Sequence, residues 1–147
     1  MPDITHDQAH EAVRTALNSV TGLEPDRLLF GNRESSWTRT QRNYRLNPAA
    51  FEDAGTYRNN VRTRINETLI IHLTHRVAAD PDRSESQAGR DAESVVQALR
   101  SDNGLRTLGV RPVWAGTDRA ESEGGDHIET DVTFELTYDL SLTLTAG

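Results

Sequence analysis

The sequence lacks cysteine and lysine, and it contains no long hydrophobic run. Without cysteine, the chain cannot form disulfides or cysteine-ligated metal sites. No apolar segment approaches the ~20 residues that a membrane-spanning helix requires. The polar N-terminal residues 1–16 do not resemble a signal peptide. We therefore expect one domain of 147 residues that is made and used in the cytoplasm.

Charge is unevenly distributed along the chain. All 16 basic residues are arginine, and the net charge is −7. The arginine-only composition fits a GC-rich genome, or interfaces where planar guanidinium groups meet carboxylates. Residues 76–147 hold fourteen acids and seven arginines, whereas residues 1–75 hold nine of each. This acidic balance argues against duplex DNA as a tightly bound ligand, because phosphate contacts need clustered positive charge.

Apolar residues at helical spacing predict two amphipathic helices, from about Thr5 to Val20 and from about Ser84 to Ser101. A capping box at the start of each helix and a turn signal after it support these bounds. The residues concerned are Thr5 with Gln8 and Ser84 with Gln87 at the starts, and Gly22 and Asn103-Gly104 at the ends.

Alternating apolar and polar residues predict a strand over residues 63–77 and another over residues 105–114. Pro112 cannot donate a ladder hydrogen bond, so the second of these should be an edge strand or contain a bulge. Residues 23–64 indicate a long irregular connection with room for one irregular strand. Residues 116–127 indicate an acidic turn.

The C-terminal segment has the clearest pattern. Apolar residues occupy the even positions from Ile128 to Leu144, interrupted only by Thr130. A strand of ~17 residues would span roughly 55 Å, whereas a compact domain of this size has a radius of gyration of ~15 Å. Such a strand either bends or leaves its domain and pairs with a neighbouring copy. On the second alternative, the subunit-interface residues are Tyr138, Leu140, Leu142 and Leu144.

Opposite charges suggest a second contact between subunits. The acidic segment 118–131 includes Asp118, Glu121 and Glu123, and an arginine-rich stretch includes Arg58, Arg62 and Arg64. In a ring each subunit presents one surface to the next, so complementary charge on two surfaces would favour assembly. The alternative is a solvated hairpin tip.

The histidines do not predict catalysis or metal binding. His72 and His75 are three apart on a strand, so they point to opposite faces. His6 and His10 are four apart on a helix and could bind zinc, but the neighbouring sequence offers no third ligand. A nucleophile elbow of the GxSxG type is missing as well. We expect no catalytic residues, no metal and no cofactor.

Three segments of the sequence resemble the lambda-type tail terminator, or tail-completion, proteins of long-tailed phages. They are DPDRSESQAGRDAE at residues 80–93, DVTFELTYDLSL at residues 131–142 and the acidic AGTDRAESEGGDH at residues 115–127. The resemblance implies an α+β fold with a mostly antiparallel (mixed) β-sheet, two packing α-helices and a long C-terminal strand.

The same resemblance implies a non-enzymatic virion structural protein in the neck of the particle, assembled in the host cytoplasm. It implies a homohexameric ring that binds the tail tube protein and then the head-tail connector protein. DNA would pass through its lumen without specific binding. Two alternatives stay open: a head–tail connector or stopper of the same particle, and a small enzyme or dimeric binding module with a ferredoxin-like sheet.

Overall fold

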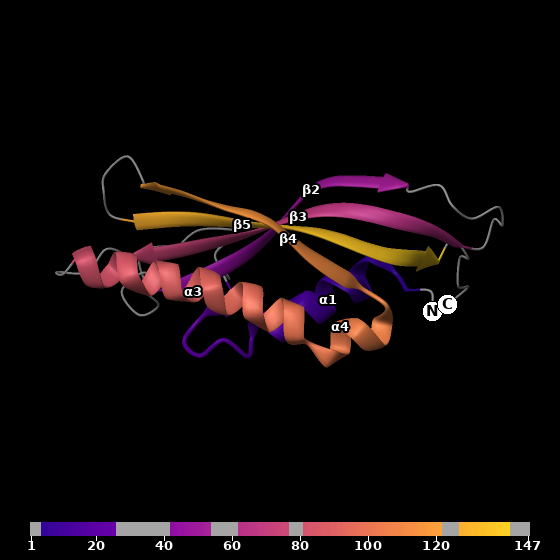
Figure 1. Ribbon diagram of the computed structural model, residues 1–147, viewed down its shortest axis with the longest axis horizontal. Helices are drawn as coiled ribbons and strands as arrows, with labels where there is room; N and C mark the ends of the chain where they lie inside the picture. Colours follow the sequence, from indigo (N-terminus) through magenta and orange to yellow (C-terminus); the bar gives the residue numbers. More distant parts are fainter. Residues whose placement is uncertain (1–3, 26–41, 54–61, 77–80, 122–126, 142–147) are drawn as a thin grey trace, which may run out of the picture.

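A computed structural model describes residues 4–25, 42–53, 62–76, 81–121 and 127–141. These residues form one sheet with helices on one side (Figure 1), which confirms the predicted α+β fold with a mostly antiparallel sheet. Among the described helices, none combines the length and apolarity that a membrane-spanning helix requires. In chain order the elements are α1 (His6–Leu17), β1 (Glu24–Pro25), β2 (Arg42–Asp53), β3 (Arg62–Arg76), α3 (Pro81–Ser101), α4 (Asn103–Leu108), β4 (Arg111–Glu121) and β5 (His127–Ser141).

The centre of the sheet is the antiparallel pair β3 and β5. The strand order is β1-β2-β3-β5-β4, and among the described strands only the short β1 runs parallel to its neighbour. β3 and β5 have 15 residues each and stay in register from Arg62 opposite Ser141 to Arg76 opposite His127. The sheet is strongly twisted, as Figure 1 shows, which is the usual consequence of strand chirality.

The long C-terminal strand is explained by this pairing. Through Ser141, β5 neither bends back nor leaves its domain, because β3 of the same chain matches it residue for residue. The two alternatives drawn from its length were therefore both wrong for residues 127–141. Leu142 and Leu144, the last two predicted interface residues, lie outside the described residues.

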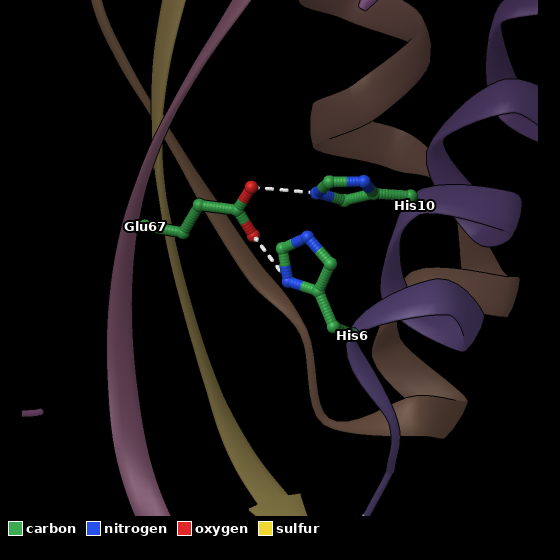
Figure 2. A group of neighbouring side chains, drawn as sticks. All are labelled: His6, His10 and Glu67. Atoms are coloured by element: carbon green, nitrogen blue, oxygen red, sulfur yellow. Dashed lines mark hydrogen bonds and ion pairs between the residues drawn. The ribbon is translucent and has the colours of Figure 1, made fainter. Parts of the chain in front are cut away.

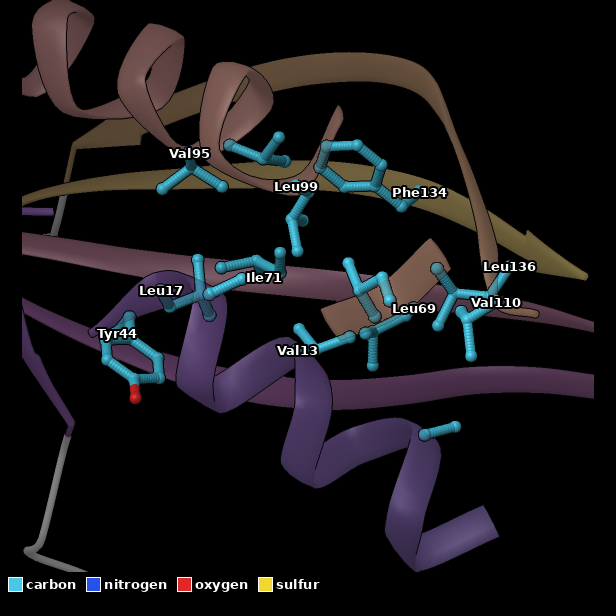
Figure 3. Packing of buried hydrophobic residues seen from close by; sticks show 14 of the residues in the cluster. Val13, Leu17, Tyr44, Leu69, Ile71, Val95, Leu99, Val110, Phe134 and Leu136 are labelled. Atoms are coloured by element: carbon cyan, nitrogen blue, oxygen red, sulfur yellow. The ribbon is translucent and has the colours of Figure 1, made fainter. Parts of the chain in front are cut away.

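The core lies between the sheet and the helices (Figure 3). Alternate residues of the central strands, such as Leu69 and Ile71 of β3 and Phe134 and Leu136 of β5, are fully buried there. The apolar stripes of α1 and α3 cover them, since side chains three and four apart share one helix face. The apolar residues of α1 and α3 at 0–2% exposure are Ala9, Val13, Ala16, Leu17, Ala88, Val95 and Leu99.

Both predicted helices exist, with shifted ends. Thr5 and Gln8 form the predicted capping box, but α1 ends at Leu17. The second helix, α3, begins at Pro81 rather than Ser84. A proline is tolerated in the first turn of a helix, where its missing N–H has no intrahelical acceptor, and Ser84 is instead buried within the helix.

The predicted strand over residues 105–114 is wrong for its first part. Asp102 accepts a hydrogen bond from the Leu105 backbone N–H at 2.9 Å and caps α4. Gly109 ends that helix at φ 76°, a left-handed conformation that favours glycine. The strand β4 follows from Arg111. As predicted from Pro112, β4 is an edge strand, and its register shifts between Trp114 and Gly116.

Two further boundaries differ from the sequence prediction. Residues 23–64 were predicted to be a long irregular connection with room for one irregular strand. Within them, residues 42–53 form the 12-residue strand β2, whose register against β3 shifts between Pro48 and Ala50 and whose inward Tyr44 lies opposite Leu73. Pro48 is tolerated because most of β2 has no described strand on its outer side. The acidic turn at 116–127 is also shorter than predicted, since β4 continues to Glu121.

The position of Leu69 can be tested by its stability contribution. Leu69 is 0% exposed in the middle of β3, so Leu69→Ala leaves a cavity and should lower the free energy of unfolding by about 2–5 kcal/mol in chemical denaturation. The control is Ser86→Ala on the exposed side of α3, which should change stability by about 0.5 kcal/mol or less. Equal effects of the two substitutions would contradict this core.

Candidate functional site

A carboxylate lies inside the core. Glu67 occupies a helix-facing position of β3, between the buried Ile65 and Leu69, and it is 0% exposed. Its side chain points at α1, where His6 and His10 face it (Figure 2). An unpaired buried carboxylate would lower the stability of the fold by several kcal/mol. Glu67 can therefore be buried here only because these side chains contact it.

Four side chains form the cluster, from α1, β3 and β5. Glu67 Oε2 lies 2.5 Å from His10 Nε2, and Glu67 Oε1 accepts a hydrogen bond from the Tyr138 hydroxyl at 3.0 Å. His6 Nδ1 is 3.0 Å from the Tyr138 hydroxyl and 3.6 Å from Glu67 Oε1. Both carboxylate oxygens of Glu67 therefore have polar partners.

Local structure fixes the two histidines. Residues four apart on a helix lie on the same face, one turn apart, and the Thr5 capping box sets where α1 begins. Before the helix, the Ile4 backbone N–H donates to the Asp139 carbonyl at 3.0 Å, which holds the entry to α1 against β5. The Phe51 ring packs edge-on against His6 at 5.0 Å between centroids.

The electrostatics of the cluster keep Tyr138 a donor. Burial raises the pKa of Tyr138 far above its ordinary value, and the negative charge of Glu67 and the hydrogen bond to it act in the same direction. The hydroxyl therefore stays protonated and orients the carboxylate. His10 is buried, whereas the side chain of His6 is 37% exposed and gives the cluster its access to solvent.

This arrangement corrects one step of the sequence reasoning. His6, His10 and Glu67 each offer a ligand atom, and these atoms all lie within 4.8 Å of one another. The third side chain that the neighbouring sequence did not supply thus comes from β3, 57 positions after His10. The available signal was an acid at an inward position of a strand whose other inward residues are mostly apolar.

A second buried polar network joins α3 to the sheet. Asp91 of α3 is 2% exposed and lies 2.6 Å from His75 Nε2. The Arg42 guanidinium binds both Asp91 oxygens, and the Gln87 amide donates to one of them at 2.9 Å. Burial opposes ionisation of Asp91, but the hydrogen bonds from His75 and Arg42 outweigh it and lower its pKa to about 2.

The predicted opposition of His72 and His75 is confirmed. His75 faces the core, whereas His72 lies on the other side of the sheet, which we call the open face. No described helix covers this face (Figure 1). There His72 Nδ1 is 2.6 Å from Asp131 Oδ1, and its Nε2 is 3.8 Å from Glu129 Oε1. The two histidines cannot share a ligand.

The predicted interface residues have different environments in the structure. Tyr138 was wrongly assigned to an interface, because it is 1% exposed within the core of its own chain, and Leu140 is partly buried against the same core. Arg64 binds Asp139 of its own chain at 3.3 Å, and Asp118 is exposed on β4. Arg62 and Glu121 lie at the start of β3 and the end of β4, whereas Arg58, Glu123, Leu142 and Leu144 lie outside the described residues.

The Asp91 network predicts an acid-dependent loss of stability. Because the pKa of Asp91 falls from 3.8 to about 2 on folding, its contribution is present above about pH 4 and is lost as the pH drops through 2. The contribution should be about 2 kcal/mol. Denaturation between pH 2 and pH 6 should show this component in the wild type and in the exposed Glu93→Gln control. Its persistence in Asp91→Asn would refute the assignment.

No protein-family model matches the chain, and a search of curated proteins gives no match.

Proposed function

We propose that this chain is a structural subunit of a tailed-phage particle, a tail terminator that assembles into a ring at the end of the tail tube. The sequence resemblance described above suggests this role, and the α+β fold is compatible with it. The structural observation that supports it most is the exposed edge strand β4, which carries the exposed residues Asp118, Val113 and Trp114.

Asp118 and Arg64 lie on the same face but far apart. Asp118 is opposite Asp131, which is opposite His72 of β3, whereas Arg64 is eight positions earlier on β3 and opposite Asp139. At ~3.3 Å per residue along a strand, Asp118 and Arg64 are separated by roughly 26 Å. These groups cannot meet within one chain, where Arg64 binds Asp139 at 3.3 Å. Between two copies arranged head to tail, Asp118 of one copy would reach the Arg64–Asp139 pair of the next.

Two negative charges, those of Asp118 and Asp131, lie directly opposite each other near the edge of the sheet. Like charges directly opposite each other on neighbouring strands are destabilising, and Asp118 and Asp131 stand in that relation. His72 binds Asp131 at 2.6 Å, but Asp118 is exposed at the sheet edge. A guanidinium from a neighbouring subunit would offset this repulsion.

Apolar exposure near the same edge favours a protein partner. Val113 and Trp114 of β4 are 60% and 48% exposed, and β4 is an edge strand. Exposed apolar edge strands are prone to pair with another chain unless they are protected. A head-to-tail contact along β4 is heterologous, and such contacts generate closed rings when the rotation between copies closes.

Assembly can be tested with Asp118→Arg. We expect wild-type protein to form six-fold rings in negative-stain images, with a matching mass in light scattering. Reversing the exposed charge of Asp118 should shift the population toward smaller species, because it turns attraction at the contact into repulsion. Raising the salt concentration should weaken the wild-type ring, since exposed charge pairs are screened.

The matched control is Asp82→Arg, which reverses an exposed acid on α3, away from the open face. It should leave the rings intact. A wild-type protein that stays monomeric, or two-fold particles in the images, would contradict the ring. A second measurement tests whether the protein acts at the end of the tail tube. Added protein should limit the length of polymerising tail tubes, and unchanged tube lengths would argue against a terminator.

A further inference from the structure

We propose that His6, His10 and Glu67 form a zinc-binding site that links α1 to β3. This site is independent of the ring and of the contacts along β4. It rests on the chemistry of the three groups, their distances and the hydrogen bonding of the carboxylate.

The donor set suits zinc. Two imidazoles and one carboxylate are typical protein ligands of this ion, at about 2.0–2.2 Å from the metal. Ligand atoms at tetrahedral positions around such an ion are separated by about 3.4 Å. His6 Nδ1 already lies 3.6 Å from Glu67 Oε1, and the three ligand atoms lie within 4.8 Å of one another. Zinc binding must lengthen the His10–Glu67 contact, which is 2.5 Å.

The neighbouring side chains position these ligands. Tyr138 donates to one lone pair of Glu67 Oε1 at 3.0 Å, which orients the carboxylate and leaves the second lone pair of this oxygen for a metal. Metal-binding carboxylates are commonly held by hydrogen bonds of this kind. The Phe51 ring, packed edge-on at 5.0 Å, restricts the ring of His6.

Burial determines the character of the site. Glu67 is 0% and the side chain of His10 8% exposed, whereas that of His6 is 37% exposed. An ion would enter beside His6, where water can complete four-fold coordination. Zinc must compete with the protons of the imidazoles, so binding should weaken as the pH falls. Because the ligands come from two elements, the bound ion would stabilise the packing of α1 on the sheet.

Metal binding can be measured on the full-length protein after treatment with a chelator. Titration with zinc chloride in a calorimeter should give one site per chain, and Co²⁺ at the same site should show the visible absorption of tetrahedral coordination. Zinc should also raise the melting temperature. These readouts do not depend on assembly. Zinc binding can therefore be found even if the protein forms no ring, and a ring can be found even if the protein binds no zinc.

Two substitutions test the assignment of ligands. Tyr138→Phe retains the aromatic ring of the side chain but removes its hydrogen bond to Glu67. It should weaken zinc binding roughly 10–100-fold. His6→Gln removes the most exposed ligand and should weaken binding by more than this. Circular dichroism and thermal melting of the metal-free variants should report a retained fold.

The matched control is His127→Gln, at the other end of β5 from Tyr138. It should bind zinc as the wild type does. A metal-free hydrogen-bonded network is the competing explanation of the same four side chains. Absence of zinc binding by the wild type, or binding that His6→Gln leaves unchanged, would establish that explanation and overturn the metal site.

Discussion

The pairing of β3 with β5 is the constraint on which the rest of the structure depends. Fifteen residues of each strand lie opposite one another without a register shift. This alignment sets which side chains face the helices, because successive residues of a strand point to opposite sides. A slip by one residue would put Glu67 and Tyr138 on opposite faces, so that only one of them could reach His6 and His10. The polar cluster, the core and the open face therefore share one origin.

Much of the fold could be predicted from local patterns. The alternation in β5 and β3, the stripe and capping box of α1 and the edge position of Pro112 each express a preference that acts over a few residues. Elements of this kind were identified, with errors at their ends. The start of α3 was placed at Ser84 because Ser84 and Gln87 imitate a capping box, whereas the helix begins at Pro81.

The remaining features depend on contacts between distant residues. β2 is too polar to stand out, and its alignment opposite β3 makes it a strand. α4 is six residues long and relies on Asp102 and Gly109 at its ends. The His6, His10 and Glu67 cluster could not be assembled from the sequence, because the register of β3 against α1 is a tertiary property. An inward acid in β3 marked the position, and its partners came only with the fold.

The order of synthesis gives the β3–β5 alignment a kinetic consequence. The paired residues are separated by about 50 to 80 positions, a strongly non-local arrangement of the kind that folds slowly. On the ribosome, at about 5–20 residues per second, β3 must wait several seconds for β5 to emerge. β2 precedes β3 and can cover one of its edges during that interval. The opposite edge of β3 meanwhile keeps unpaired backbone groups, in a strand that contains several isoleucine and leucine residues. An exposed edge of this kind is prone to aggregation and is a target for a chaperone.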